Sequence, residues 1–196
     1  MNFLAHAYLS FDQPKILVGN FIGDFVRGDL EQQFEKEIVN GIMLHREIDA
    51  FTDCHPLVKE AQSLLKPIFK RYATVITDMY FDYFLAKNWC NYDERPLESF
   101  VQWVYGVLRS HQAILPKKFL YPFKYMQQEN WLVNYGTMEG LQRSFTGLSY
   151  RTAFESKMEK APEFLTLHHD EFKDYFQLFF AELTSFSKDT LDQIAL

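Results

Sequence analysis

The stretch that most constrains the fold is Val75-Ile76-Thr77-Asp78-Met79-Tyr80-Phe81-Asp82-Tyr83-Phe84-Leu85. It is apolar and aromatic apart from Thr77 and two carboxylates, Asp78 and Asp82, which lie four residues apart. Residues at positions i and i+4 of a helix share one face. A charge among apolar residues is costly unless it is paired or bound to a metal. The stretch therefore predicts a helix that directs two acids inward.

The composition predicts the same kind of structure for the whole chain. The 196 residues are 47% hydrophobic and 17% aromatic, with 20 Phe and 11 Tyr but only 8 Gly and 7 Pro. Long helices that pack through large rings fit this composition better than a turn-rich β fold. A chain of this length can bury a substantial core without dividing into two domains. We expect an all-α fold in which residues 1–196 form a single-domain helical bundle.

The hydrophobic pattern and the prolines locate the helices, because proline begins, ends or kinks a helix. The expected helices span residues 2–10, 15–27, 34–52, 57–71, 73–89, 96–113, 120–134, 137–144, 150–159 and 168–186.

Two further segments carry acids toward the interior. In Leu44–Pro56, His45 and Asp49 lie one helical turn apart and can converge on one ion or water. In Val18–Val26, Asp24 is the only ionisable residue among apolar neighbours. Spacing alone is as compatible with solvated charges as with a metal site. Three helices that direct acids inward favour the metal site.

One imidazole with several carboxylates would offer mostly oxygen ligands. Such a set suits Mn²⁺, Mg²⁺ or Fe²⁺ better than a thiolate-rich zinc site does. A bound ion polarises a phosphoryl oxygen and lowers the pKa of water, while a nearby carboxylate orients or deprotonates that water. The two cysteines, Cys54 and Cys90, have no CxxC spacing and indicate no disulfide framework. The pattern indicates metal-dependent hydrolysis.

Several functional classes are disfavoured. No secretory signal pattern opens the sequence, and no apolar run approaches the roughly 20 residues that span a bilayer, so a cytoplasmic protein is expected. The net charge of -6 argues against a nucleic-acid partner. An acidic protein partner would need a local basic patch, although scattered solvated lysines are equally compatible with the sequence. The candidate basic residues are Lys66, Lys70, Arg71, Lys117, Lys118 and Lys124.

Four motifs carry a family resemblance. They are Met1–His6, Gly19–Phe25, Gly41–Asp53 followed by His55-Pro56, and Asp78–Leu85. In order and spacing they resemble the acyl carrier protein phosphodiesterase family, a divergent relative of the HD-domain metal-dependent phosphohydrolases. The resemblance implies hydrolysis of the phosphodiester between 4'-phosphopantetheine and a serine of holo acyl carrier protein, giving apo carrier and 4'-phosphopantetheine. It also implies holo carrier as the partner and Mn²⁺ as the activating ion.

The resemblance further implies roles for individual residues. HD enzymes typically use a His, an adjacent His-Asp pair and a distant Asp as metal ligands. The pair here reads His45-Arg46, so Arg46 is expected to contact the phosphate or neutralise an acid. The implied metal ligands are His45, Asp24 in the place of the upstream His, and Asp78 or Asp82 as the distant Asp. The implied catalytic residues are Asp49 near the attacking water, Arg46, and His6 over the metal site.

Two other functions remain compatible with the sequence. A metal-dependent phosphohydrolase acting on a nucleotide or (p)ppGpp would also need inward acids, and it would cleave a free small molecule without a protein partner. A non-catalytic helical binding module would instead pair its acids with Arg27, Arg46 and Arg71 and would bind no metal.

Overall fold

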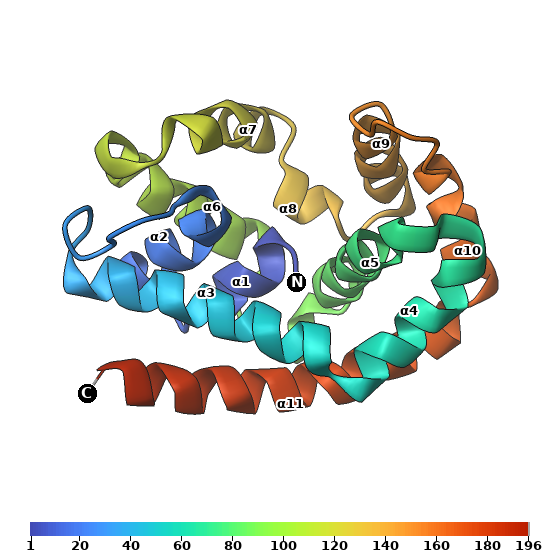
Figure 1. Ribbon diagram of the computed structural model, residues 1–196, viewed down its shortest axis with the longest axis horizontal. Coiled ribbons are helices and arrows are strands. Elements are labelled where there is room, and N and C mark those ends of the chain that lie inside the picture. Colours follow the sequence, from blue (N-terminus) through green and yellow to red (C-terminus); the bar gives the residue numbers. More distant parts are fainter. Residues whose placement is uncertain (196) are drawn as a thin grey trace.

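The computed structural model describes residues 1–195, and that part of the chain contains helices and no strand (Figure 1). The α-helices are α1 (Phe3–Tyr8), α2 (Pro14–Ile22), α3 (Lys36–Cys54), α4 (Pro56–Phe69), α5 (Ala73–Lys87), α6 (Leu97–Ser110), α7 (Lys117–Gln128), α8 (Trp131–Asn134), α9 (Met138–Ser149), α10 (Ala161–Leu167) and α11 (His169–Ala195). The all-α helical bundle expected from the sequence is confirmed. Its relation to the HD-domain arrangement stays a prediction.

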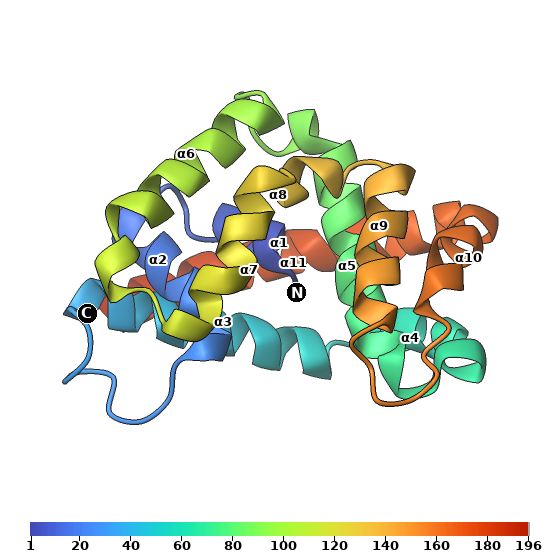
Figure 2. The ribbon, with the colours of Figure 1, turned by 90° about the horizontal axis from the view of Figure 1, so that it is seen from above.

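The helices form layers around the N-terminal segment. The long helix α11 runs beneath α3, α4 and α5, while α7, α8 and α9 lie above the chain start (Figure 1). Seen from above, α7 and α9 lie on opposite sides of the N-terminus (Figure 2). This arrangement leaves the first helix between a packed floor and an upper layer.

Aromatic side chains hold α5 in the core, as its composition predicts. Phe81 and Phe84 are fully buried and pack on α11, with ring centroids 5.4 Å from Phe179 and 5.9 Å from Phe176. Burying a side chain of this size stabilises the fold by roughly 1.5–3 kcal/mol. The apolar part of α5 therefore anchors the helix, and its two acids face the first helix.

Two glycines allow α2 and α3 to cross at very short range. A Cβ atom on Gly19 would overlap the carbonyl oxygen of Ile38, and one on Gly41 would overlap the carbonyl oxygen of Ile16. Any larger residue at either position would force the helices apart. Because Asn20 follows the first of these glycines, the crossing holds Asn20 against α3.

The structure corrects two of the expected helices. Residues 150–159 do not form a helix; they are turns and extended chain as far as a 3₁₀ turn at Met158–Lys160, and α10 follows. The expected helix over residues 120–134 is broken between α7 and α8, where Asn130 adopts a left-handed conformation with φ 48°. A left-handed residue cannot continue an α-helix, and Lys157, with φ 57°, likewise lies between segments.

No helix within residues 1–195 is long and apolar enough to cross a membrane.

Candidate metal centre

Two histidines from different helices meet in the interior. His6 of α1 is 3% exposed and His45 of α3 is 6% exposed. Their rings stack with centroids 4.2 Å apart and an interplanar angle of 24°. Each buried ring nitrogen of an imidazole needs a hydrogen-bond partner, so the partners of these two rings decide what the site can do.

Asn20 of α2 fixes the orientation of both rings. Its side-chain oxygen lies 2.7 Å from His6 Nδ1, and its backbone oxygen lies 2.8 Å from His45 Nδ1. The side-chain nitrogen of Asn20 donates to the carbonyl oxygen of His6 and to Ser10 Oγ, which sets the amide so that its oxygen faces the ring. Both Nδ1 atoms therefore donate, which leaves each Nε2 atom as the position that can take up a proton or a metal ion.

The two Nε2 atoms are the unusual feature of the site. Both are buried, and neither has a hydrogen-bond partner within the described residues. Each lies 3.3 Å from a different oxygen of Asp49, His6 from Oδ1 and His45 from Oδ2, but without hydrogen-bond geometry. Asp24 Oδ1 lies 3.4 Å from His45 Nε2, and the Asp24 side chain is 77% exposed. The two Nε2 atoms and the carboxylate of Asp49 thus face one point, and the Asp24 carboxylate lies beside His45.

The titration of these groups shows that the site attracts positive charge. Burial acts to lower the pKa of His45, but the carboxylates of Asp24 and Asp49 raise it to about 9. Burial and the charge of His45 lower the pKa of His6 to about 4. Burial acts to raise the pKa of Asp49, yet the two imidazoles hold it well below its ordinary value. The carboxylates favour a cation at the place where the two Nε2 atoms point.

A metal ion fits this arrangement. The donor atoms of His6, His45 and Asp49 all lie within 4.8 Å of one another, a spacing at which they could hold one ion. The unpartnered Nε2 atoms supply the physical reason, because a buried nitrogen lone pair without a donor costs free energy that an ion would recover. Mixed nitrogen and oxygen donors are compatible with Mn²⁺ or Fe²⁺.

Gly23 forms part of the wall behind His45. It begins the 3₁₀ turn Gly23–Phe25, which follows α2 and presents Asp24 to the site. A Cβ atom on Gly23 would overlap the His45 ring. The absence of a side chain therefore lets this imidazole lie directly against the turn that carries the neighbouring carboxylate.

The structure does not bring all the residues expected from the sequence to the histidine pair. Asp82 is fully buried on α5, where its two oxygens accept hydrogen bonds from the backbone N–H groups of Leu4 and Ala5 at 2.8 and 3.3 Å. It thus holds the start of α1, which is the helix that carries His6. Arg46 is exposed and makes no ion pair within residues 1–195.

Asp78 is connected to the histidines only indirectly. Its Oδ1 atom is 3.4 Å from the nitrogen of Met1, which is also 3.4 Å from Asp49. Asp78 is thus linked to the histidine group through the first residue of the chain rather than by direct contact. Arg27 and Arg71, like Arg46, make no ion pair in the described part of the chain, which removes the salt bridges expected of a non-catalytic module.

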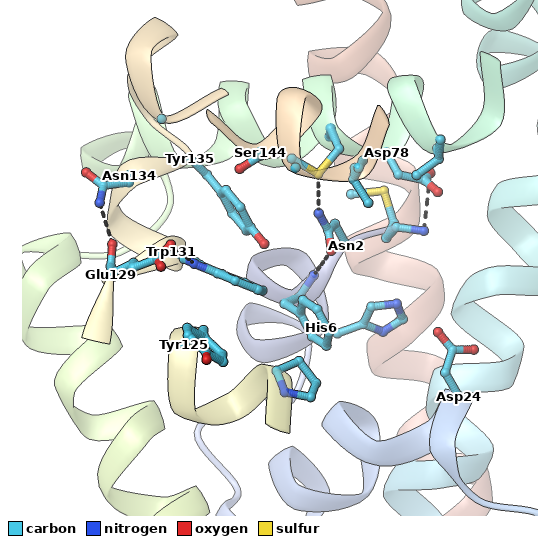
Figure 3. Close-up of a pocket in the computed structure, with 18 of the residues that line it drawn as sticks. Asn2, His6, Asp24, Asp78, Tyr125, Glu129, Trp131, Asn134, Tyr135 and Ser144 are labelled. Carbon is cyan, nitrogen blue, oxygen red and sulfur yellow. Dashed lines mark hydrogen bonds and ion pairs between the residues drawn. The ribbon is translucent and has the colours of Figure 1, made fainter. Parts of the chain in front are cut away.

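A cavity of about 760 Å³ adjoins the site. His6, Asp24 and Asp78 line one end, and aromatic residues of the upper layer line the other (Figure 3). Volumes between about 300 and 1,000 Å³ are typical of pockets that hold small organic ligands. The aromatic and amide residues at the far end are Tyr125, Trp131, Asn134 and Tyr135. The candidate metal centre therefore opens into a space large enough for an elongated organic group.

Sequence reasoning missed Asn20 as the residue that orients both imidazoles, and it missed the cavity wall. The presence of an amide in the otherwise apolar run Leu17–Ile22 was a usable signal for Asn20, since a buried amide must be hydrogen-bonded. The aromatic residues of the cavity gave no comparable signal, because aromatic residues occur throughout this sequence.

Comparisons with known proteins show the family of this chain. The family model described as acyl carrier protein phosphodiesterase matches residues 1–183. The chain belongs to the acyl carrier protein phosphodiesterase family. The proteins named acyl carrier protein phosphodiesterase from Enterobacter sp. (strain 638) and Klebsiella pneumoniae (strain 342) are 33% and 32% identical to it, each over 93% of this chain and 95% of the relative. One from Yersinia enterocolitica is 30% identical over 96% of this chain and 98% of the relative.

The family resemblance noted in the sequence is thereby confirmed, and the match extends well beyond the motifs that carried it. No solved structure gave a significant match to the chain.

Proposed function

We propose that this member of the acyl carrier protein phosphodiesterase family is a metal-dependent hydrolase of holo acyl carrier protein. It cleaves the phosphodiester between 4'-phosphopantetheine and the carrier serine, and water supplies the oxygen that ends on the phosphate and the proton that ends on the serine. The observation that carries the proposal is the pair of buried, unpartnered Nε2 atoms of His6 and His45, which face Asp49 at the end of a cavity.

His6, His45 and Asp49 would hold the ion, and the Asp24 carboxylate lies beside them at the edge of the site. We favour Mn²⁺, with Mg²⁺ or Fe²⁺ as alternatives, because the donors are imidazole nitrogens and carboxylate oxygens. A bound ion of this kind polarises the phosphoryl oxygen and lowers the pKa of water. Asp78 and Asp82 are not proposed as ligands, since each is engaged elsewhere.

The chain's own residues supply position and proton transfer. Asn20 holds both imidazoles with Nε2 toward the cavity. Asp24, the most exposed acid of the group, is placed to orient a water or accept its proton at the edge of the site. Arg46 has no proposed part in this mechanism, because the exposed guanidinium makes no contact with the group.

The cavity supports the choice of substrate. A pantetheine arm is long, carries amides and ends in a thiol, and a space of about 760 Å³ lined by aromatic rings and Asn134 suits such a group. The carrier protein itself would remain outside, because only its arm has the dimensions of the cavity. Holo carrier is therefore the proposed partner.

The decisive experiment follows the mass of holo acyl carrier protein incubated with the purified protein and Mn²⁺, with and without EDTA. We expect loss of the phosphopantetheine group with Mn²⁺ and no loss with EDTA. A carrier mass that stays unchanged under both conditions would contradict the proposal.

The second candidate is a phosphohydrolase that acts on a nucleotide or (p)ppGpp. Tyr125 and Trp131 favour it to some degree, since aromatic faces in a cavity can stack on a nucleobase. The same preparation, tested with free nucleotides, separates the two functions, because a nucleotide enzyme needs no carrier protein.

A further inference from the structure

One face of α9 lines the cavity at the end away from the histidines. The lining residues of this segment are Gly140, Arg143, Ser144, Gly147, Leu148 and Arg151. Their separations of three and four residues place them on a single helical face. Arg143 lies within the helix and Arg151 in the turn that follows it. Figure 3 shows Ser144 of this face above the cavity.

The two arginines of this face are exposed and uncommitted. Among residues 1–195 neither has an ion pair or a side-chain hydrogen bond. Arg95 by contrast pairs with Asp12 and Asp93, and Arg109 donates to Gln127. Arg27 and Arg46 also have no ion pair among residues 1–195, but they do not line the cavity. Arginine is the side chain best suited to bind carboxylates and phosphates.

Charged residues of both signs line the cavity. The histidine end carries the carboxylates of Asp24 and Asp78, Glu129 lies beside Trp131 at the other end, and the α9 face carries two cations. A third cation, Lys124, is exposed on α7 three positions after Tyr121, which lines the cavity. The pKa of Tyr121 is raised chiefly by Tyr125, and the charges of Arg151 and Lys124 both act to lower it.

The spacing of the arginines indicates the size of the anion. Arg143 and Arg151 are eight positions apart; the six positions from Arg143 to the end of α9 at Ser149 correspond to roughly 9 Å along the axis. A single phosphate group is only a few Å across, and both side chains could grasp it only by folding toward each other. The space between them is open, because Gly147 has no side chain and a Cβ there would meet nothing within 4 Å. Two separate anions fit this face better than one.

We propose that Arg143 and Arg151 form a docking surface for an acidic helix of the protein substrate, with carboxylates seven or eight residues apart. The proposal rests on the proposed function, because the carrier must sit at the mouth of the cavity while its arm reaches the metal centre. It places the docking surface on the rim formed by α9 and, of the basic residues considered in the sequence, keeps only Lys124.

The test measures binding rather than turnover. The Mn²⁺-loaded protein is titrated with apo acyl carrier protein, which has no bond to cleave, at 20 and 200 mM salt. The variants are the double reversal Arg143→Glu/Arg151→Glu, the α7 reversal Lys118→Glu, and Lys59→Glu as a charge control on an exposed position of α4. Thermal unfolding of each variant checks that it is folded.

We expect the arginine reversal to weaken carrier binding at low salt by about tenfold or more and to flatten its salt dependence. Lys59→Glu and Lys118→Glu should change the affinity less than twofold. An arginine variant that binds the carrier normally would overturn the proposal. So would equal losses in all three variants, which would indicate net charge alone, or a loss confined to Lys118→Glu.

Free 4'-phosphopantetheine, titrated in parallel, tests the single-phosphate alternative. If the arginine reversal weakens binding of this small molecule and leaves carrier binding intact, the arginines bind the phosphate and the docking proposal is overturned. Turnover of holo carrier by the wild-type protein is scored separately. If the arginine variant loses carrier binding but the wild-type protein does not turn over holo carrier, the docking surface stands and the proposed reaction is rejected. If the wild-type protein turns over holo carrier but the arginine variant binds the carrier normally, the reaction stands and the docking surface is rejected.

Discussion

The imidazole of His6 lies 4.2 Å from that of His45, centroid to centroid, and neither Nε2 atom has a hydrogen-bond partner among residues 1–195. A stack of one neutral and one protonated imidazole gains little free energy by itself. Two protonated imidazoles at this distance would repel each other. The arrangement makes physical sense if a cation replaces the proton of His45 and both lone pairs bind it. The following expectations depend on that geometry.

Removal of either imidazole should abolish metal binding. We expect His6→Ala or His45→Ala to abolish hydrolysis and to weaken Mn²⁺ binding by more than roughly 10–100-fold. That range is typical of losing a residue that only hydrogen-bonds to a metal ligand. Isothermal titration with Mn²⁺ measures the effect. His111→Ala, which alters the histidine directly after α6 and outside the site, is the control. Wild-type affinity in both site variants would place the metal elsewhere.

Asn20 should act through the histidines. Asn20→Ala removes the acceptor of His6 Nδ1, so the ring can rotate and change tautomer. We expect Mn²⁺ affinity to fall by about 10–100-fold, with a smaller loss than in His6→Ala. The matched control is Ser10→Ala, which removes another hydrogen bond of the same amide and leaves the ring contact in place. Equal effects of the two substitutions would show that Asn20 only supports folding.

Gly23 should be intolerant of even one added carbon. In Gly23→Ala the Cβ atom would displace the His45 ring, and a misplacement of about 1 Å can cost roughly 10²-fold in rate. Gly106→Ala in α6 is the control, because the nearest atom to its Cβ would be 3.9 Å away. That control should be more stable than the wild type by up to about 1 kcal/mol, since alanine favours a helix. Hydrolysis rates and melting curves of both variants provide the measurement; normal turnover in Gly23→Ala would contradict the tight packing.

Asp82 should make stability depend on pH. Burial raises the pKa of Asp82 to about 7 from its ordinary value of 3.8. Between these two pH values the folded state keeps a proton that the unfolded state has lost, so the free energy of unfolding falls as pH rises through this window and then levels off. The full effect is about 4 kcal/mol at most.

Asp82→Asn removes this titration. Urea unfolding in EDTA at several pH values should show the wild type losing stability relative to the variant as pH rises from about 4 to 7. Asp189→Asn, at an exposed position of α11, controls for the change in charge. A constant difference between wild type and Asp82→Asn would contradict the raised pKa. Unlike His45→Ala, the variant should keep its affinity for Mn²⁺, and loss of that affinity would restore Asp82 as a ligand.

Local spacing was sufficient to predict much of the fold and one half of the site. The apolar and aromatic runs gave the helices, and the i, i+4 relation of His45 and Asp49 survives in the structure as a contact of 3.3 Å. The same relation misled for Asp78 and Asp82, whose partners lie in the first five residues of the chain. Contacts across nearly eighty residues leave no periodic trace in a sequence.

The close crossing of α2 and α3 at Gly19 and Gly41 also bears on how the protein folds. The hydrogen bond from His45 to Asn20 closes a loop of 25 residues, whereas the hydrogen bond from the Leu4 N–H group to Asp82 closes one of 78. Short loops close sooner and at a lower entropic cost than long ones. His45 should therefore reach its final position early in folding. The metal centre should become complete only when α1 packs against α5 and His6 comes to lie beside His45.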